Sequence, residues 1–99
     1  MDSQKTVVIW KTKAEKSLQG IYDFIANDSI LYAEKFVNKL IDFGHNLNLF
    51  PDKYPICRQQ KFLKRSYHCA VFENNYLFVY KVVRKQLIIY NIIHCKRLR

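Results

Sequence analysis

The sequence predicts an α+β fold: an N-terminal strand, an antiparallel helix hairpin, and a three-stranded antiparallel meander, with the helices packed on one face of the sheet. Two observations predict it. Apolar residues recur at helical spacing through the first half, whereas residues 66–95 fall into three stretches rich in Tyr, Phe, Val and Ile. With 99 residues, of which 49% are hydrophobic, the chain has room for one domain, residues 1–99.

The first half predicts a strand and two helices. Residues 6–10 form a β-branched and aromatic run typical of a strand. Thr12 and Glu15 have the spacing of a capping box, which places the start of a helix that runs to about residue 27. Residues 27–29 (Asn-Asp-Ser) end that helix and supply a second N-cap, and the next helix extends toward Phe50. The helical apolar positions are Ala14, Leu18, Ile21, Tyr22 and Ile25, then Ala33, Phe36, Val37, Leu40 and Ile41.

The second half predicts a loop and three strands joined by hairpins. Residues 51–61 have no periodicity and contain two prolines, which indicates a loop. The links between the strands are too short for anything except hairpins, and Asn74-Asn75 suits a turn that requires positive φ. The link at Arg84-Lys85 is less typical. The middle strand is apolar on both faces, which favours a central position. The expected strands are residues 66–73, 76–83 and 86–95.

The charge is distributed unevenly between the two halves. Residues 1–50 carry six Lys and six acidic residues, for a net charge of zero. Residues 51–99 carry eleven Lys and Arg against Asp52 and Glu73, which accounts for the whole formal charge of +9. This excess of positive charge in residues 51–99 predicts a cationic surface that binds a polyanion, whether nucleic acid, an acidic protein or an anionic membrane surface. The alternative is that these residues only solvate loops and one side of the sheet.

The apolar runs, the first residues and the cysteines indicate the cellular compartment. The longest apolar runs are too short to span a membrane, and the first five residues do not resemble a signal peptide. The three cysteines, Cys57, Cys69 and Cys95, are odd in number and are not spaced like a disulfide framework. We therefore expect a reduced, cytoplasmic protein.

The order of these segments resembles the RelE/ParE superfamily of bacterial type II toxin–antitoxin toxins, the plasmid stabilisation family. The N-terminal half matches through Val8-Ile9-Trp10, residues 14–18 and residues 21–26. Residues 76–80 are similar to the family's Tyr-Arg-x-x-Tyr strand, and residues 88–97 are similar to its closing Ile-x-x-x-His-x-x-Arg pattern. The resemblance covers nearly the whole chain and implies a growth-inhibiting toxin that a cognate antitoxin keeps silent.

The resemblance implies two possible targets. RelE-like members are ribosome-dependent mRNA endoribonucleases, whereas ParE-like members inhibit DNA gyrase without cutting RNA. Leu77 stands where the Tyr-Arg-x-x-Tyr strand has Arg, and Phe72 stands at a position that is often basic in the nucleases. Both departures remove phosphate-binding charge, so the ParE-like branch is favoured. Whether the chain is an enzyme stays open; if it is one, it is an mRNA endoribonuclease.

Candidate site residues follow from the chemistry of RNA cleavage, which needs cations on the phosphate and groups that move protons. Histidine titrates near neutral pH, so His94 is the best proton-transfer candidate. Strand alternation predicts that Tyr90, Ile92 and His94 lie on one face of the last strand. Each of these residues also has a purely structural interpretation, in packing, backbone hydrogen bonding or solvation. The candidate catalytic residues are His94, Arg97, Arg65 and Tyr90, and the candidate nucleic-acid or partner-binding residues are Arg58, Lys61, Lys64, Arg84, Lys85, Lys96 and Arg99.

No cofactor or metal is expected. The pairs His68-Cys69 and His94-Cys95 invite a zinc interpretation, but neighbours in a regular strand point to opposite faces and cannot chelate one ion.

Three functions therefore compete: an antitoxin-neutralised toxin, a ribosome-dependent nuclease, and a non-enzymatic basic nucleic-acid-binding module or degenerate toxin. The expected partners are an acidic, partly disordered antitoxin segment and, as target, either DNA gyrase or the ribosome with its mRNA.

Overall fold

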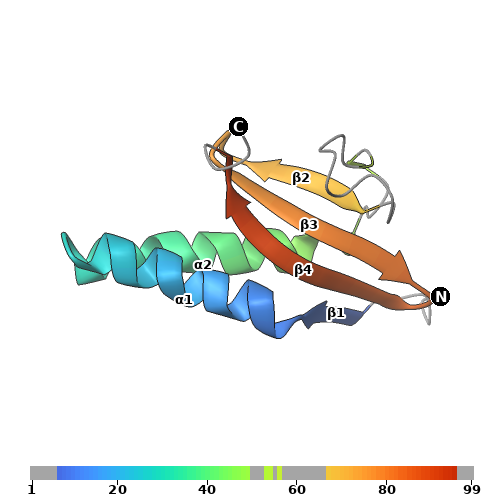
Figure 1. Ribbon diagram of the computed structural model, residues 1–99, viewed down its shortest axis with the longest axis horizontal. Helices are drawn as coiled ribbons and strands as arrows, with labels where there is room; N and C mark the ends of the chain where they lie inside the picture. The colour runs from blue at the N-terminus through green and yellow to red at the C-terminus, as the bar shows by residue number, and fades with distance from the viewer. Residues whose placement is uncertain (1–6, 50–52, 55, 57–66, 96–99) are drawn as a thin grey trace.

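A computed structural model describes residues 7–49, 53, 54, 56 and 67–95 of the chain. One strand, two helices and then three strands follow one another, with the helices on one face of the sheet, so the predicted α+β fold is confirmed (Figure 1). None of the described helices is long and apolar enough to cross a membrane. The elements are β1 (Val7–Trp10), α1 (Thr12–Ala26), α2 (Ile30–Asn46), β2 (His68–Phe72), β3 (Tyr76–Val83) and β4 (Gln86–His94).

The four strands form one mixed sheet in the order β1-β4-β3-β2. β3 pairs antiparallel with both β2 and β4, which confirms the predicted meander and the central place of the middle strand. β1 pairs parallel with β4, in the register Val7 to Gln86 through Trp10 to Ile89. The last strand therefore lies beside the first one, and β4 is an interior strand, as β3 is.

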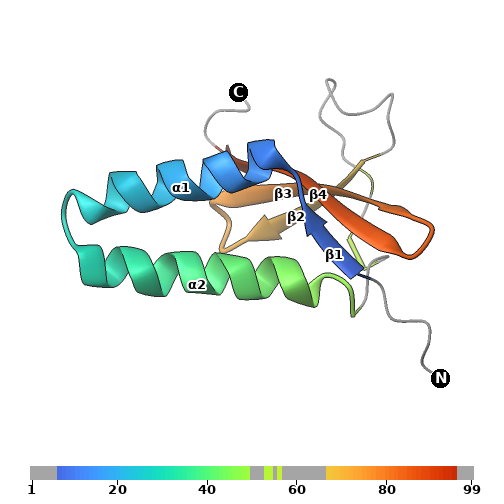
Figure 2. The same cartoon turned by 90° about the horizontal axis from the view of Figure 1, so that it is seen from below.

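The two helices lie side by side and run in opposite directions, and their connection projects beyond the sheet (Figure 2). The second N-cap is confirmed, because the Ser29 hydroxyl accepts a hydrogen bond of 3.1 Å from the Tyr32 N–H. The predicted capping box at Thr12 is wrong. The Lys11 N–H donates to the Ile89 carbonyl as a continuation of the β1–β4 ladder, so Lys11 is the N-cap and no side chain caps α1.

Both hairpin turns use positive φ, but one is shifted from its predicted place. In the β2–β3 turn the positive angles belong to Glu73 and Asn74, at 50° and 61°, rather than to Asn74 and Asn75. The Asn75 N–H donates to the Phe72 carbonyl, which closes the turn one residue earlier than predicted and leaves Asn75 as an added residue before β3. The β3–β4 turn is the predicted link, with Arg84 at a φ of 58°.

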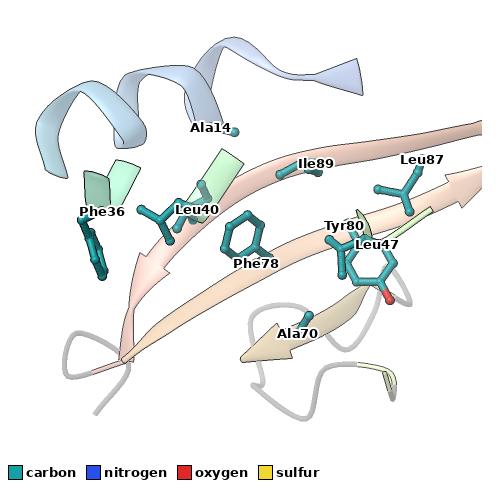
Figure 3. Close-up of a cluster of buried hydrophobic side chains, with 10 residues drawn as sticks. Ala14, Phe36, Leu40, Leu47, Ala70, Phe78, Tyr80, Leu87 and Ile89 are labelled. Atoms are coloured by element: carbon teal, nitrogen blue, oxygen red, sulfur yellow. The ribbon is translucent and has the colours of Figure 1, made fainter. Parts of the chain in front are cut away.

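The main core lies between the helices and the sheet (Figure 3). The side chains of Phe78, Tyr80, Leu87 and Ile89 point from the two interior strands toward the helices and are fully buried. Alternation along the strands selects this set, because each second residue faces the helices. The other buried residues of the main core are Ala14, Phe36, Leu40, Leu47, Ala70 and Ile92.

The other face of the sheet, which we call the open face, has a second and smaller apolar centre. Leu77 and Val79 are buried there, and Tyr67, Cys69, Ile93 and Cys95 pack against them. The strands of the basic half form this face as expected, but its described centre is apolar rather than cationic.

The cysteines differ from expectation. Cys69 is disulfide-bonded, whereas Cys95 is free. The prediction that the cysteines are reduced is therefore wrong for Cys69. An odd number of cysteines argues against a complete disulfide framework, but it does not exclude a single bridge.

Candidate functional site

A β-bulge in β4 decides which candidate residues share a face. Val79 pairs with Asn91 and Tyr80 pairs with Ile89, so Tyr90 is an extra residue that β3 does not match. The Tyr90 ring lies 4.8 Å from the ring of Tyr67, which packs against the open-face cluster. A bulge places two successive residues opposite one partner and so interrupts strict alternation. Tyr90 therefore lies on the open face.

His94 lies on the opposite face from Tyr90. It pairs with Tyr76 across β3 and β4, and the two rings are 5.0 Å apart. The Tyr76 ring lies 5.6 Å from the ring of Phe36 in α2, which places this pair on the helix side of the sheet. Ile92 also belongs to the helix-side core. The prediction that Tyr90, Ile92 and His94 share one face is wrong for Tyr90, because the bulge changes the phase of the strand.

Leu77 and Phe72, where the resemblance to the nucleases implies cations, both make apolar contacts. Leu77 is 6% exposed in the open-face cluster. Phe72 packs on the other side of the sheet, with its ring 5.1 Å from Phe43 and 6.1 Å from Phe36. A charged group at either position would lose its hydration on folding, so these replacements suit packing and not phosphate binding.

The remaining candidates do not gather around His94 within the described residues. Arg84 and Lys85 are exposed at the β3–β4 turn. They lie at the start of β4, whereas His94 ends that strand, roughly 26 Å away at the usual rise per residue. Arg58, Lys61, Lys64, Arg65, Lys96, Arg97 and Arg99 lie outside the described residues.

A pocket of about 380 Å³ lies on the open face, where the start of α1 meets the bulge. Its lining residues are Lys11, Thr12, Lys13, Tyr67, Tyr90 and Asn91, with Val79 as an apolar wall. Of these residues, the sequence predicts only Tyr90 as a site residue. The signal that was missed is the Lys-Thr-Lys run at a predicted helix start, which the zero net charge of the first half concealed.

Asn91 is held in place by two hydrogen bonds to one atom. Its Oδ1 accepts from the Ser17 hydroxyl at 2.7 Å and from the Ile92 N–H at 2.9 Å. Because both donors meet Oδ1, the amide orientation is defined and Nδ2 is the remaining donor group. The bond from Ser17 also ties α1 to β4 beside the pocket.

The histidine–cysteine pairs divide between the two faces. The His68 ring stacks on Tyr80 at 5.3 Å on the helix side, and its Nδ1 lies 2.8 Å from the Tyr54 carbonyl oxygen. Cys69 packs on the open face. Neighbours in β2 therefore point apart, as predicted, and no three His, Cys, Asp or Glu side chains come together in the part of the chain that the structure describes.

Comparison with solved structures supports the fold. The chain is similar to a chain described as "Chromosomal ParDE TA system from P. aeruginosa", with a TM-score of 0.73 and 16% sequence identity. The match covers 92% of this chain and 97% of that one. At this identity the similarity shows a shared fold. No curated protein matches the sequence.

The family follows from the sequence as a whole. The family described as "ParE toxin of type II toxin-antitoxin system, parDE" matches residues 8–99, which is nearly the entire chain. The strand–helix–helix–meander fold is thus that of a toxin of the RelE/ParE superfamily. Within it, the chain belongs to the ParE toxin family of type II toxin–antitoxin systems.

Proposed function

We propose that this toxin arrests bacterial growth by inhibiting DNA gyrase and that a cognate antitoxin neutralises it. The observation that supports this target over the ribosome is the separation of Tyr90 from His94. Tyr90 lies with Tyr67 on the open face, and His94 lies with Tyr76 on the helix side. Proton-transfer groups on opposite faces of one sheet cannot act on the same phosphate.

The buried Leu77 supports the same choice. Cleavage of RNA through its 2′-hydroxyl develops charge on the phosphate, which preorganised cations must stabilise. At Leu77 the open face instead presents a side chain that is packed with Val79 and Ile93. The described open face thus offers an apolar contact at the place where a nuclease of this superfamily would present an arginine.

The expected antitoxin is an acidic, partly disordered segment. The +9 formal charge of the second half is complementary to such a segment and would speed its association. A small acidic reading frame adjacent to or overlapping the gene is the candidate for this partner. Because type II toxins act inside the cell, we place both partners in the cytoplasm.

The decisive experiment compares the two targets with the same purified chain. Supercoiling of relaxed plasmid by gyrase is measured in one arm, and integrity of an mRNA on translating ribosomes is measured in the other. We expect supercoiling to be inhibited while the mRNA stays intact, and His94→Ala to retain the inhibition. Because disulfides persist mainly in oxidising compartments, both arms are run with and without reductant to allow for Cys69.

Cleavage of mRNA with unaffected supercoiling would assign the chain to the nuclease branch. Loss of that cleavage in His94→Ala, with an unchanged circular dichroism spectrum, would then make His94 a catalytic residue. Addition of the candidate antitoxin should restore supercoiling at an equimolar amount, and failure to do so would reject that reading frame as the partner.

A further inference from the structure

The open-face pocket at the start of α1 has the lining of an anion site. Lys11 and Lys13 are exposed there, and among the described residues neither forms an ion pair. None of the described residues that line the pocket is acidic. Two cations that line one cavity without a described counter-ion favour an anionic occupant.

The backbone adds to the same field. The first N–H groups of α1 have no acceptor inside the helix, and the N-cap Lys11 provides no side-chain oxygen for them. These donors carry the positive end of the helix dipole. They add to the field of the two lysines, which is the larger contribution because the lysines are full charges that line the cavity.

Two of the described lining residues are aromatic. The rings of Tyr67 and Tyr90 are 4.8 Å apart and inclined at 51°, so the two aromatic side chains contact each other beside the cavity. The Lys81 ammonium lies 5.7 Å from the centre of the Tyr67 ring and adds a third cation beside it. Beside these rings, Asn91 lines the same cavity with its Nδ2 group as a donor, since its Oδ1 is already occupied.

Cations and aromatic rings that line the same cavity suit one class of ligand. We propose that this pocket binds a nucleotide unit, with the phosphate between Lys11 and Lys13 and the base against Tyr90. A volume of about 380 Å³ lies at the small end of ligand pockets, as a single nucleotide requires. An acidic peptide would use the lysines but would leave the tyrosine surface without a matching flat group. The inference does not depend on gyrase being the target.

Binding is tested on the full chain by NMR titration and by fluorescence anisotropy. AMP represents a free nucleotide, a labelled single-stranded oligonucleotide represents a strand, and inorganic phosphate represents the anion alone. We expect AMP to shift the backbone amides of Lys11, Thr12, Lys13 and Asn91. Tighter binding of the oligonucleotide would identify a nucleic-acid strand as the source of the nucleotide, and equal binding would identify the free nucleotide.

Two double variants separate the pocket from general charge. Lys11→Glu with Lys13→Glu should weaken binding of AMP and the oligonucleotide at least about tenfold. Lys16→Glu with Lys39→Glu makes the same change in net charge at exposed helical positions outside the pocket, and it should have a much smaller effect. All four lysines are exposed, so none of these changes removes a packed side chain.

The aromatic contact has its own variant. Tyr90→Leu should weaken AMP binding by roughly tenfold, a loss typical of a stacked base, and should leave binding of inorganic phosphate unchanged. Equal weakening by the two lysine double variants would overturn the proposal. So would binding of phosphate as tight as that of AMP, or displacement of the oligonucleotide by an oligoglutamate peptide together with no effect of Tyr90→Leu.

Discussion

Gly44 of α2 lies directly against the indole of Trp10 in β1. A β carbon at Gly44 would be 2.5 Å from Cη2 and 2.7 Å from Cζ2 of that ring, and 3.1 Å from the Cδ1 atom of Ile89. The indole is itself confined, because its ring centre lies 5.8 Å from that of His45 and 6.3 Å from that of Phe78. This contact sets the distance between α2 and the β1–β4 pair.

Gly44→Ala should therefore destabilise the protein even though alanine favours a helix. The gain in helix propensity is about 1 kcal/mol, whereas overpacking a rigid contact costs about 1–3 kcal/mol. We expect a net loss of up to about 2 kcal/mol in the free energy of unfolding, measured by urea denaturation. Gly20→Ala is the matched control, because nothing lies within 4 Å of its added β carbon, and it should stabilise by up to about 1 kcal/mol. Equal effects of the two variants would contradict the close contact.

Alanine substitutions at the starts of the two helices should differ in their effect on the free energy of unfolding. Ser29→Ala removes the acceptor of the Tyr32 N–H and should lower the free energy of unfolding by about 1 kcal/mol. Thr12→Ala should change it by less than about 0.5 kcal/mol, because Lys11 and not Thr12 is the N-cap of α1. Thermal and urea denaturation of both variants provide the measurement. A loss of stability in Thr12→Ala as large as that in Ser29→Ala would indicate that the Thr12 side chain caps α1.

Restoring the family's arginine at Leu77 should harm stability and create no nuclease. Leu77→Arg places a charge where the side chain is 6% exposed, and we expect it to cost about 3 kcal/mol or more. Val71→Arg is the matched control. Val71 is the cross-strand partner of Leu77 on the same face, yet it is 46% exposed and should tolerate the change within about 0.5 kcal/mol. Robust mRNA cleavage by a folded Leu77→Arg protein would show that the charge alone had been missing.

The bond between Ser17 and Asn91 should contribute measurably because it is partly buried. Ser17→Ala leaves Asn91 Oδ1 with only the Ile92 N–H, and we expect a loss of about 1 kcal/mol. Gln19→Ala removes an exposed bond to Asp23 on the same helix and should cost a few tenths of a kcal/mol. Hydrogen exchange at the Asn91 and Ile92 amides would show whether the loss loosens the bulge, and equal losses in both variants would argue against that role.

Patterns within single segments predicted much of the fold. The apolar positions Ala33, Phe36 and Leu40 of α2 are buried as their spacing requires, and Ser29 caps the helix as its sequence context suggests. These features depend on residues within one or two turns of each other, so local propensity is sufficient to reveal them.

The candidate site was predicted less well. The sequence predicts both His94 and Tyr90 as site residues, but their predicted placement on one face requires an uninterrupted strand. The bulge at Tyr90 arises from how β4 pairs with β3, and no pattern inside β4 alone records it. The pocket was missed for the same kind of reason, since Lys11 and Lys13 meet the aromatic residues of the second half only after folding.

The sequence by itself determined the order of the elements, the hairpin of α1 and α2, the three-strand meander and the charge of each half. Only the tertiary structure decided that β1 lies parallel to β4, that Lys11 rather than Thr12 caps α1, and that Tyr90 and His94 face opposite ways. The physical reason is that strand pairing joins residues far apart in the chain. A single pairing shift or bulge changes the face of every residue beyond it.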